Sequence, residues 1–281
     1  MSPSVAIVTD STAYLPSQET SRLGITVVPL QVVVGGRPFD DMAQIDGVSV
    51  AEALGQWVPV TTSRPAPHRF AEAYGEAAAR GATAVVSVHL SAEMSGTAEA
   101  ARAAAEDSPI PVDVVDSRSI AMGLGFPVLA AAGAAAAGAT RQEVVDVARR
   151  TAESARSFFY VDTLEHLRRG GRIGAAATLL GSALMIKPIL HISDGTIVPL
   201  EKVRTSARAI GRLEDLAAAA AGDAPVAIAV QHLGAASRAE TLAARLSRRL
   251  PALTGLTVVE VGPVIGAHVG PGMLGITVSP S

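Results

Sequence analysis

Short hydroxyl-bearing segments follow several apolar runs of this sequence, and they contain residues that could bind or transform a ligand. Ser95 and Gly96 come after the apolar run 85–90 and before the Ala-rich segment 98–106. The apolar run is typical of a buried strand and the Ala-rich segment of a helix. A junction of this kind presents free backbone N–H groups and the positive end of a helix dipole, which favour an anion. We therefore take Ser95 and Gly96 as the centre of a candidate anion site.

A histidine near the end of the chain could serve a serine in catalysis or a ligand in binding. His268 is surrounded by glycines, and glycines such as Gly270 let the backbone approach a ligand closely. A serine esterase or thioesterase would use Ser95 as nucleophile, with His89 or His268 as base. The usual nucleophile turn has Gly two residues before the Ser, and here that residue is Glu93. These residues leave binding and hydrolysis both open.

Other patterns that suggest cofactor or metal sites lack a required part. Residues 270–275 have the spacing G-x-G-x-x-G, but a dinucleotide site also needs a following helix and an acidic residue about 20 positions on, which residues 276–281 do not supply. Asp10 is followed two positions later by Thr12 instead of the second Asp typical of an aspartyl-phosphate site, so a turn or cap is favoured. The acidic residues of segment 40–46 have no His nearby. We expect no metal and no nucleotide cofactor.

The composition restricts the class of protein further. The chain has 281 residues, of which 49% are hydrophobic, so it can bury two cores and disorder is not expected. A formal net charge of −3 argues against a nucleic-acid-binding protein, and the absence of Cys excludes disulfides and thiolate chemistry. Segment 1–5 lacks the features of a signal peptide, and the uncharged segment 120–138 contains Pro127 and mostly Ala and Gly, which favours a core helix over a membrane span. We expect a cytoplasmic protein.

The order of the predicted elements indicates an α/β protein with two lobes. Residues 1–157 alternate strands with helices, which predicts a mostly parallel sheet flanked by helices. The loops after its strands, at residues 10–12, 91–97 and 116–117, should therefore open on one edge. Residues 158–281 should form a mixed sheet with helices, because Asp194 and Gly195 predict a hairpin.

Local signals predict the limits of several elements. Residues 61–65 are expected to form a hydroxyl-bearing loop, 174–185 an apolar helix, and 262–275 a Gly-rich loop. Three pairs of residues have the spacing of a capping box and predict helix starts: Ser49 with Glu52, Thr140 with Glu143, and Asp162 with Glu165.

Short motifs recur in a fixed order along the chain, and together they are more specific than any one of them. They are residues 9–12, 62–65, 95–97, 116–117, 167–173 and 187–189, and His268 with residues 270–272. In this order and at these intervals they resemble the DegV family of bacterial fatty-acid-binding proteins, nearly from end to end. The resemblance implies two α/β lobes with one long-chain fatty acid in a tunnel between them.

The resemblance also implies which residues hold the fatty acid. The family binds the carboxylate through the Thr and Ser of a Thr-Ser-Gln-Pro loop, the Ser of Ser-Gly-Thr, and the His before Gly-Pro-Gly. The implied ligand-binding residues here are Thr62, Ser63, Ser95 and His268, with Gly96 and Gly270 beside them. One departure is visible, because Arg64 stands where the family usually has Gln.

A partner protein is implied as well. Family members with a partner fatty acid kinase present the bound acid for phosphorylation to an acyl phosphate, a step toward phospholipid synthesis. Arg172 and Arg204 match Arg residues of the partner-facing surface in that family. The residues themselves leave a second interpretation open, in which the basic segment 166–172 complements the end of a helix dipole. The expectation is a non-catalytic carrier, with the fatty acid as its ligand, no cofactor, and transient contact with a membrane surface.

Overall fold

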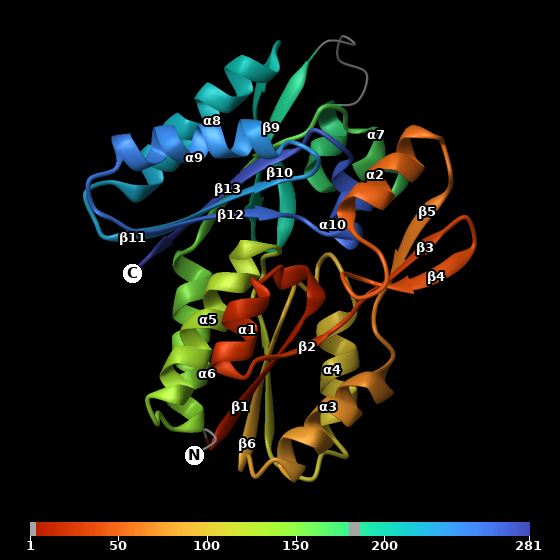
Figure 1. Cartoon of the computed structure of the whole chain (residues 1–281), viewed down its shortest axis with the longest axis vertical. Helices are drawn as coiled ribbons and strands as arrows, with labels where there is room; N and C mark the ends of the chain where they lie inside the picture. The colour runs from red at the N-terminus through yellow and green to blue at the C-terminus, as the bar shows by residue number, and fades with distance from the viewer. Residues whose placement is uncertain (1–3, 180–185) are drawn as a thin grey trace. The chain divides into compact units, whose positions relative to one another are not determined.

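The computed structural model describes residues 4–179 and 186–281 and divides the chain into two compact units (Figure 1). Unit 1 comprises Met1–Gln31 and Ser63–Ser154, and unit 2 comprises Val32–Thr62 and Ala155–Ser281. Both units combine helices with a β-sheet, which confirms the predicted α/β class. Part of the segment 1–5 and part of the expected helix 174–185 lie outside the described residues.

Unit 1 is organised around a four-stranded sheet in the order β2-β1-β6-β7. Its strands are β1 (Val5–Asp10), β2 (Thr26–Val28), β6 (Ala84–His89) and β7 (Val112–Asp116). Every neighbouring pair is parallel, and Thr9 of β1 is in register with Val88 of β6. The loops that follow β1, β6 and β7 therefore start at the same edge of the sheet, as the sequence predicts.

Helices cover both faces of this sheet. They are α1 (Ser17–Leu23), α3 (Pro67–Ala79), α4 (Thr97–Ala105), α5 (Met122–Ala136) and α6 (Arg141–Ser154), and the 3-10 helix η1 (Ser11–Ala13) follows β1. Figure 1 shows α5 and α6 on one face and α3 and α4 on the other. Most of α5 is buried, which agrees with the predicted core helix. Among the described residues, no helix has the length and apolar character needed to cross a membrane.

Unit 2 contains a six-stranded mixed sheet in the order β10-β9-β8-β13-β11-β12. Its strands are β8 (Arg156–Tyr160), β9 (Lys187–Ser193), β10 (Thr196–Val203), β11 (Val226–His232), β12 (Leu253–Glu260) and β13 (Leu274–Pro280). The pair β11 and β12 is parallel and the other pairs are antiparallel. Asp194 and Gly195 have φ angles of 51° and 81° in the turn between β9 and β10, which confirms the predicted hairpin.

The helices of unit 2 lie against this sheet or beside the segment Val32–Thr62 of the same unit. They are α7 (Glu165–Arg169), α8 (Ser206–Ala221), α9 (Ala236–Arg249) and α10 (Pro263–Val269), with the 3-10 helix η2 (Gly174–Leu179). The amphipathic helices α8 and α9 pack together and bury Leu213, Leu242 and Leu246 against the sheet. This layer forms the hydrophobic core of unit 2.

The segment Val32–Thr62 groups with unit 2, whereas the division after residue 157 places it in the N-terminal lobe. It contains helix α2 (Gly47–Gly55), which packs against α10, and most of a three-stranded sheet of β4 (Arg37–Asp40), β3 (Gln31–Val34) and β5 (Val60–Ser63). The Asp41 carboxylate accepts a hydrogen bond from the Val264 backbone N–H at 3.2 Å. Contacts between residues so far apart in sequence leave no local signal, so the sequence did not indicate that this segment groups with unit 2.

Two predicted capping boxes are wrong and one is confirmed. The N-cap of α2 is Asp46, whose carboxylate accepts from the Ser49 N–H at 2.8 Å, so the helix begins before the predicted box. Helix α7 has Leu164 at its N-cap and no side-chain cap there. The third box holds, since the Glu143 carboxylate accepts from the Thr140 N–H at 2.8 Å.

Two predicted loops contain regular structure. Strand β5 includes residues 61–63 of the expected hydroxyl loop, because it pairs within the three-stranded sheet. Helix α10 lies inside the expected Gly-rich loop 262–275, with Pro263 in its first turn and almost all of its residues buried. The expected helix at 174–185 is a 3-10 helix over Gly174–Leu179, and its remaining residues lie outside the described ones.

Candidate functional site

Unit 2 brings together two of the residues that the resemblance implies for binding the carboxylate, although they lie far apart in the sequence. Thr62 is near the end of β5, and His268 lies in the last turn of α10. The Thr62 hydroxyl and the His268 Nε2 atom are 2.9 Å apart and share a hydrogen bond, although 206 positions separate the two residues. The fold of unit 2 thus assembles a hydroxyl and an imidazole into one polar pair.

The environment keeps His268 uncharged. Burial, together with the nearby Arg172 guanidinium, lowers the pKa of His268 from 6.5 to about 4. A neutral imidazole carries one proton, so one ring nitrogen donates and the other accepts. In the tautomer with the proton on Nε2, His268 donates to Thr62 and leaves the Thr62 hydroxyl proton for a ligand. The Nδ1 atom is buried and has no hydrogen-bond partner among the described residues.

Two glycines lie so close to imidazole rings that a side chain would not fit: Gly170 lies against His268, and Gly270 lies against His166. A Cβ atom at Gly170 would overlap the His268 ring, and a Cβ at Gly270 would overlap the ring of His166. Gly270 also has a φ of 73° just after α10, a conformation that other residues rarely adopt. The structure therefore explains why a glycine occupies position 270. Gly170, which lies in the motif 167–173, has a structural reason as well, although the motif assigned it no role.

The two arginines implied in partner contact are both exposed in unit 2. Arg172 follows α7, and its Nη1 donates to the Gly170 carbonyl oxygen at 2.7 Å. Arg204 lies between β10 and α8. Arg172 also opposes protonation of His268 through its charge, so it is linked electrostatically to the Thr62–His268 pair.

In unit 1, the loop between β6 and α4 carries Ser95 and Gly96. The Ser95 N–H donates to the Ser91 carbonyl oxygen at 3.1 Å, and the Ser91 N–H donates to the Ser119 carbonyl oxygen at 2.9 Å. Gly96 is the N-cap of α4 and provides no side-chain cap. The Ser95 hydroxyl is 2.9 Å from that of Thr97, the first residue of the helix. This geometry confirms the predicted strand–loop–helix junction.

Arg64 lies directly over Gly96. Its Nη1 atom donates to the Gly96 carbonyl oxygen at 3.2 Å and to the Glu99 carboxylate at 3.0 Å. A Cβ atom at Gly96 would be 2.6 Å from that nitrogen, so a larger residue there would displace the guanidinium. Ser63 is exposed, and its hydroxyl makes a long contact of 3.5 Å to the Gln31 amide oxygen. In this chain, the arginine of the Thr-Ser-Arg-Pro motif thus secures the Ser95 loop.

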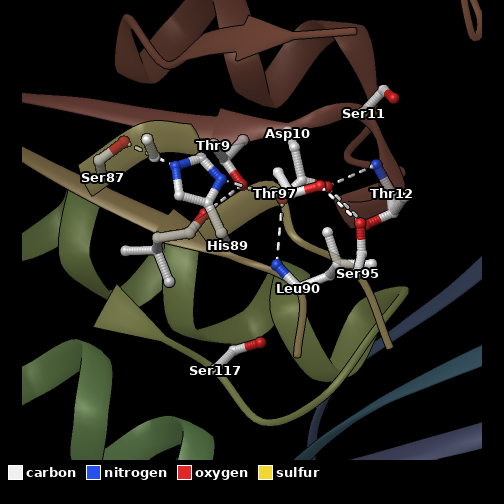
Figure 2. A network of polar contacts seen from close by, with 12 residues as sticks. Thr9, Asp10, Ser11, Thr12, Ser87, His89, Leu90, Ser95, Thr97 and Ser117 are labelled. Atoms are coloured by element: carbon white, nitrogen blue, oxygen red, sulfur yellow. Dashed lines mark hydrogen bonds and ion pairs between the residues drawn. The ribbon is translucent and has the colours of Figure 1, made fainter. Parts of the chain in front are cut away.

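A buried polar network lies at the carboxyl ends of the parallel strands β1 and β6 in unit 1 (Figure 2). The Asp10 carboxylate accepts from the Leu90 N–H at 3.0 Å and from the N–H and hydroxyl of Thr12 at 3.1 and 2.5 Å. Its Oδ2 atom is also 3.0 Å from His89 Nδ1. On the other side of the ring, His89 Nε2 is 2.7 Å from the Ser87 hydroxyl. Asp10 therefore ties the end of β1 to the end of β6.

This Ser–His–Asp series has the order of a catalytic triad but not its exposure. The side chains of Ser87, His89 and Asp10 are all fully buried or nearly so, and no substrate can reach the Ser87 hydroxyl. His89 is occupied by this network, so it cannot act as a base for Ser95. The favoured interpretation of Asp10 as a turn or cap residue is confirmed, because it is the N-cap of η1. The sequence did not reveal its link to His89.

The implied site residues thus fall into two groups, one in each unit. Unit 2 holds Thr62, His268 and Gly270, and unit 1 holds Ser63, Ser95 and Gly96. Each group offers hydroxyl groups: that of Thr62 in unit 2, and those of Ser63 and Ser95 in unit 1. Within the described parts of the chain there is no cluster of three or more side chains suited to hold a metal ion.

Comparison with known proteins shows similarity over almost the whole chain. The family model described as "Uncharacterised protein, DegV family" matches residues 4–281. A DegV domain-containing protein of Streptomyces coelicolor is 57% identical over 279 residues, which cover 99% of each chain. Two solved structures, each with 99% of both chains covered, are also similar: a fatty-acid-binding DegV family protein of Thermus thermophilus (32% identity, TM-score 0.94) and DegV, a fatty acid binding protein from Bacillus subtilis (34% identity, TM-score 0.90).

Proposed function

We propose that this chain, which belongs to the DegV family, binds a long-chain fatty acid and holds its carboxylate by hydrogen bonds. The observation that carries the proposal is the Thr62–His268 pair, an uncharged donor pair in a protein similar to two fatty-acid-binding structures. Ser63, Ser95, Gly96 and Gly270 stay predicted ligand contacts on the same proposal.

Uncharged donors suit a carrier that must release its ligand. Each buried methylene is worth roughly 0.8 kcal/mol relative to water, but a fatty acid in a bilayer has its methylenes buried already. The difference between membrane and protein then depends on the carboxylate. Each hydrogen bond to a charged group contributes about 1.5–3 kcal/mol. Two or three hydroxyl donors, one of them oriented by His268, therefore bias transfer toward the protein without fixing the acid as tightly as an arginine clamp would.

The carrier proposal includes presentation of the acid to a partner fatty acid kinase, which would form an acyl phosphate on it. Two exposed arginines, Arg172 and Arg204, support a docking surface in unit 2. The chain itself would contribute no catalysis. Transient contact with a membrane surface and a cytoplasmic location are parts of the same proposal.

The test begins with the lipid that accompanies the protein. Native mass spectrometry of the chain purified from bacterial cells should show a bound long-chain fatty acid. After delipidation, titration with oleic and stearic acid should give saturable binding. Thr62→Val should raise the Kd about ten- to a hundredfold, because one hydrogen bond to the charged carboxylate is lost.

A matched threonine provides the control. Thr241 of α9 is exposed and donates to the Ser237 carbonyl oxygen at 2.8 Å, so Thr241→Val removes a hydroxyl of the same unit and should leave the Kd unchanged. A purified protein that carries no lipid and takes up none would contradict the proposal. Covalent acylation of Ser95 by activated acyl esters would favour the serine esterase instead.

A further inference from the structure

The hydroxyl of Ser95 is linked to that of a residue to which no role was assigned. Thr97 opens α4, and its Oγ1 atom is 2.9 Å from Ser95 Oγ (Figure 2). Thr97 is fully buried, with 0% exposure, whereas Ser95 is only partly buried. The pair therefore joins an interior hydroxyl to one at the surface of unit 1.

The proton count of this pair fixes the direction of its hydrogen bond. Two hydroxyls have two protons, and one link between them uses only one. Within the described chain, Ser95 is the only hydrogen-bond partner of the Thr97 hydroxyl. A buried donor without a partner costs about 1–3 kcal/mol, whereas a partly exposed donor can turn to water or to a ligand. Thr97 therefore donates and Ser95 accepts, which leaves the Ser95 proton directed outward.

The backbone around the pair holds this arrangement in place. The Ser91 carbonyl oxygen accepts from the Ser95 N–H at 3.1 Å, on the sheet side of the loop. On the outer side, the Arg64 guanidinium donates to the Gly96 carbonyl oxygen at 3.2 Å. Ser95 thus has a fixed backbone and a fixed acceptor role.

This direction suits binding and opposes nucleophilic attack. A nucleophilic serine gives its proton to a base, but here the neighbour of Ser95 is a donor. A carboxylate only accepts hydrogen bonds, so it needs a hydroxyl whose proton is available. We propose that Thr97 is a positioning residue, which donates to Ser95 and so orients the Ser95 hydroxyl toward the carboxylate of the ligand. The inference rests on the proposed fatty-acid binding and assigns a residue to it.

A double-mutant cycle on the full-length, delipidated protein tests this role, with oleic acid as the probe. Thr97→Val, which keeps the shape of the side chain, should raise the Kd about three- to tenfold. In a Ser95→Ala background the same substitution should change the Kd by less than about a factor of two, because its effect passes through Ser95. Thr97→Ser, which keeps the hydroxyl, should restore the wild-type Kd.

A matched control separates positioning from general stability. Thr9 is also fully buried in unit 1 and donates to the Val88 carbonyl oxygen at 2.8 Å, so Thr9→Val should lower stability without changing the Kd. If Thr97→Val does not fold, Thr97→Ala removes the same hydroxyl and enters the same cycle. Wild-type binding with equal Kd values for wild type and Thr97→Val would overturn this role alone. A wild-type protein that binds no oleic acid would overturn the proposed function together with it.

Discussion

His268 is held as a neutral group, because burial and the Arg172 charge both oppose its protonation. On the proposed function, in which His268 lies beside the carboxylate of the ligand, this neutrality has a functional value. A charged imidazolium would bind the acid more tightly, and it would place a second proton on Nδ1, which has no hydrogen-bond partner among the described residues. A neutral ring can donate to Thr62 and leave the Thr62 hydroxyl to the ligand.

The same shift predicts how stability depends on pH. The unfolded chain takes up a proton on His268 near pH 6.5 and the folded chain near pH 4, so between these values the unfolded state binds more protons. The free energy of unfolding should therefore fall as the pH falls through this window, by about 3 kcal/mol for this residue. In His268→Gln this contribution should disappear, as measured by urea denaturation at pH 4, 5 and 7.

Three other histidines require the comparison with the variant. Burial also lowers the pKa values of His166, His191 and His232, so the wild type carries a pH dependence from several residues. The difference between wild type and His268→Gln isolates one of them. Parallel curves for the two proteins between pH 4 and 7 would show that His268 is protonated at the same pH in both states.

At the scale of elements, helix α2 shows how a close contact outweighs helix propensity. A Cβ atom at Gly47 would be 2.7 Å from the Val261 carbonyl oxygen and 2.9 Å from Leu233 Cδ1. At Gly55, in the same helix, no heavy atom lies within 4 Å of the corresponding position. One end of α2 is thus pressed against the rest of unit 2, and the other end is open.

The two glycines should therefore respond in opposite directions to alanine. Gly47→Ala should lower the free energy of unfolding by about 1–3 kcal/mol, because backbone atoms must move to admit the methyl group. Gly55→Ala should raise it by up to about 1 kcal/mol, because Ala loses less conformational entropy in a helix. Urea denaturation followed by the fluorescence of Trp57, the only Trp in the chain, measures both. Destabilisation of equal size by the two substitutions would contradict the close packing of α2.

Elements whose signal is local could be predicted from the sequence, and those defined by distant contacts could not. The order of strands and loops in unit 1 follows from apolar runs and polar ends, and the Asp194–Gly195 hairpin follows from its turn residues. The start of α2 was missed because Asp46 competes with Ser49 as a cap. Helix α10 was missed because its glycines and its proline suggested a loop, whereas burial stabilises it.

At the scale of the whole molecule, the contacts of the candidate site could also be predicted only in part from the sequence. The motif series pointed to Thr62 and His268 through a family resemblance, and the structure shows that they are in contact. Thr97 and Gly170 lie in the motifs 95–97 and 167–173, but a threonine at a helix start and a glycine after a basic helix are common, so the sequence did not indicate the contacts that they make. The link between Asp10 and His89 could have been sought in the sequence, because both residues end neighbouring parallel strands.

The proposed docking to a kinase would be a property of the whole molecule, and one substitution separates it from the proposed lipid binding. Arg172→Ala should leave the Kd for oleic acid within about threefold of wild type, because the charge of Arg172 acts on the pKa of His268, which stays neutral without it near pH 7. Acyl-phosphate formation by the partner kinase should fall at least about tenfold, since one charged contact at a protein interface is lost. A coupled kinase assay with saturating fatty acid measures the second quantity.

An exposed arginine elsewhere in unit 2 serves as the control. Arg248 lies on α9, and Arg248→Ala should affect neither measurement. Equal kinase rates for wild type and Arg172→Ala would remove Arg172 from the docking surface and favour its simpler role at the end of α7.

The route of the chain through its two units has a consequence for its synthesis. The chain leaves unit 1 after Gln31, returns at Ser63 and leaves again after Ser154. Ribosomes add about 5–20 residues per second, so Thr62 is made roughly 10–40 s before His268, which lies 206 positions later. All of unit 1 has been made by then, while segment Val32–Thr62 still lacks α10. The Thr62–His268 pair therefore forms only after all of unit 1 has been made, and the proposed carboxylate site cannot be complete before that point.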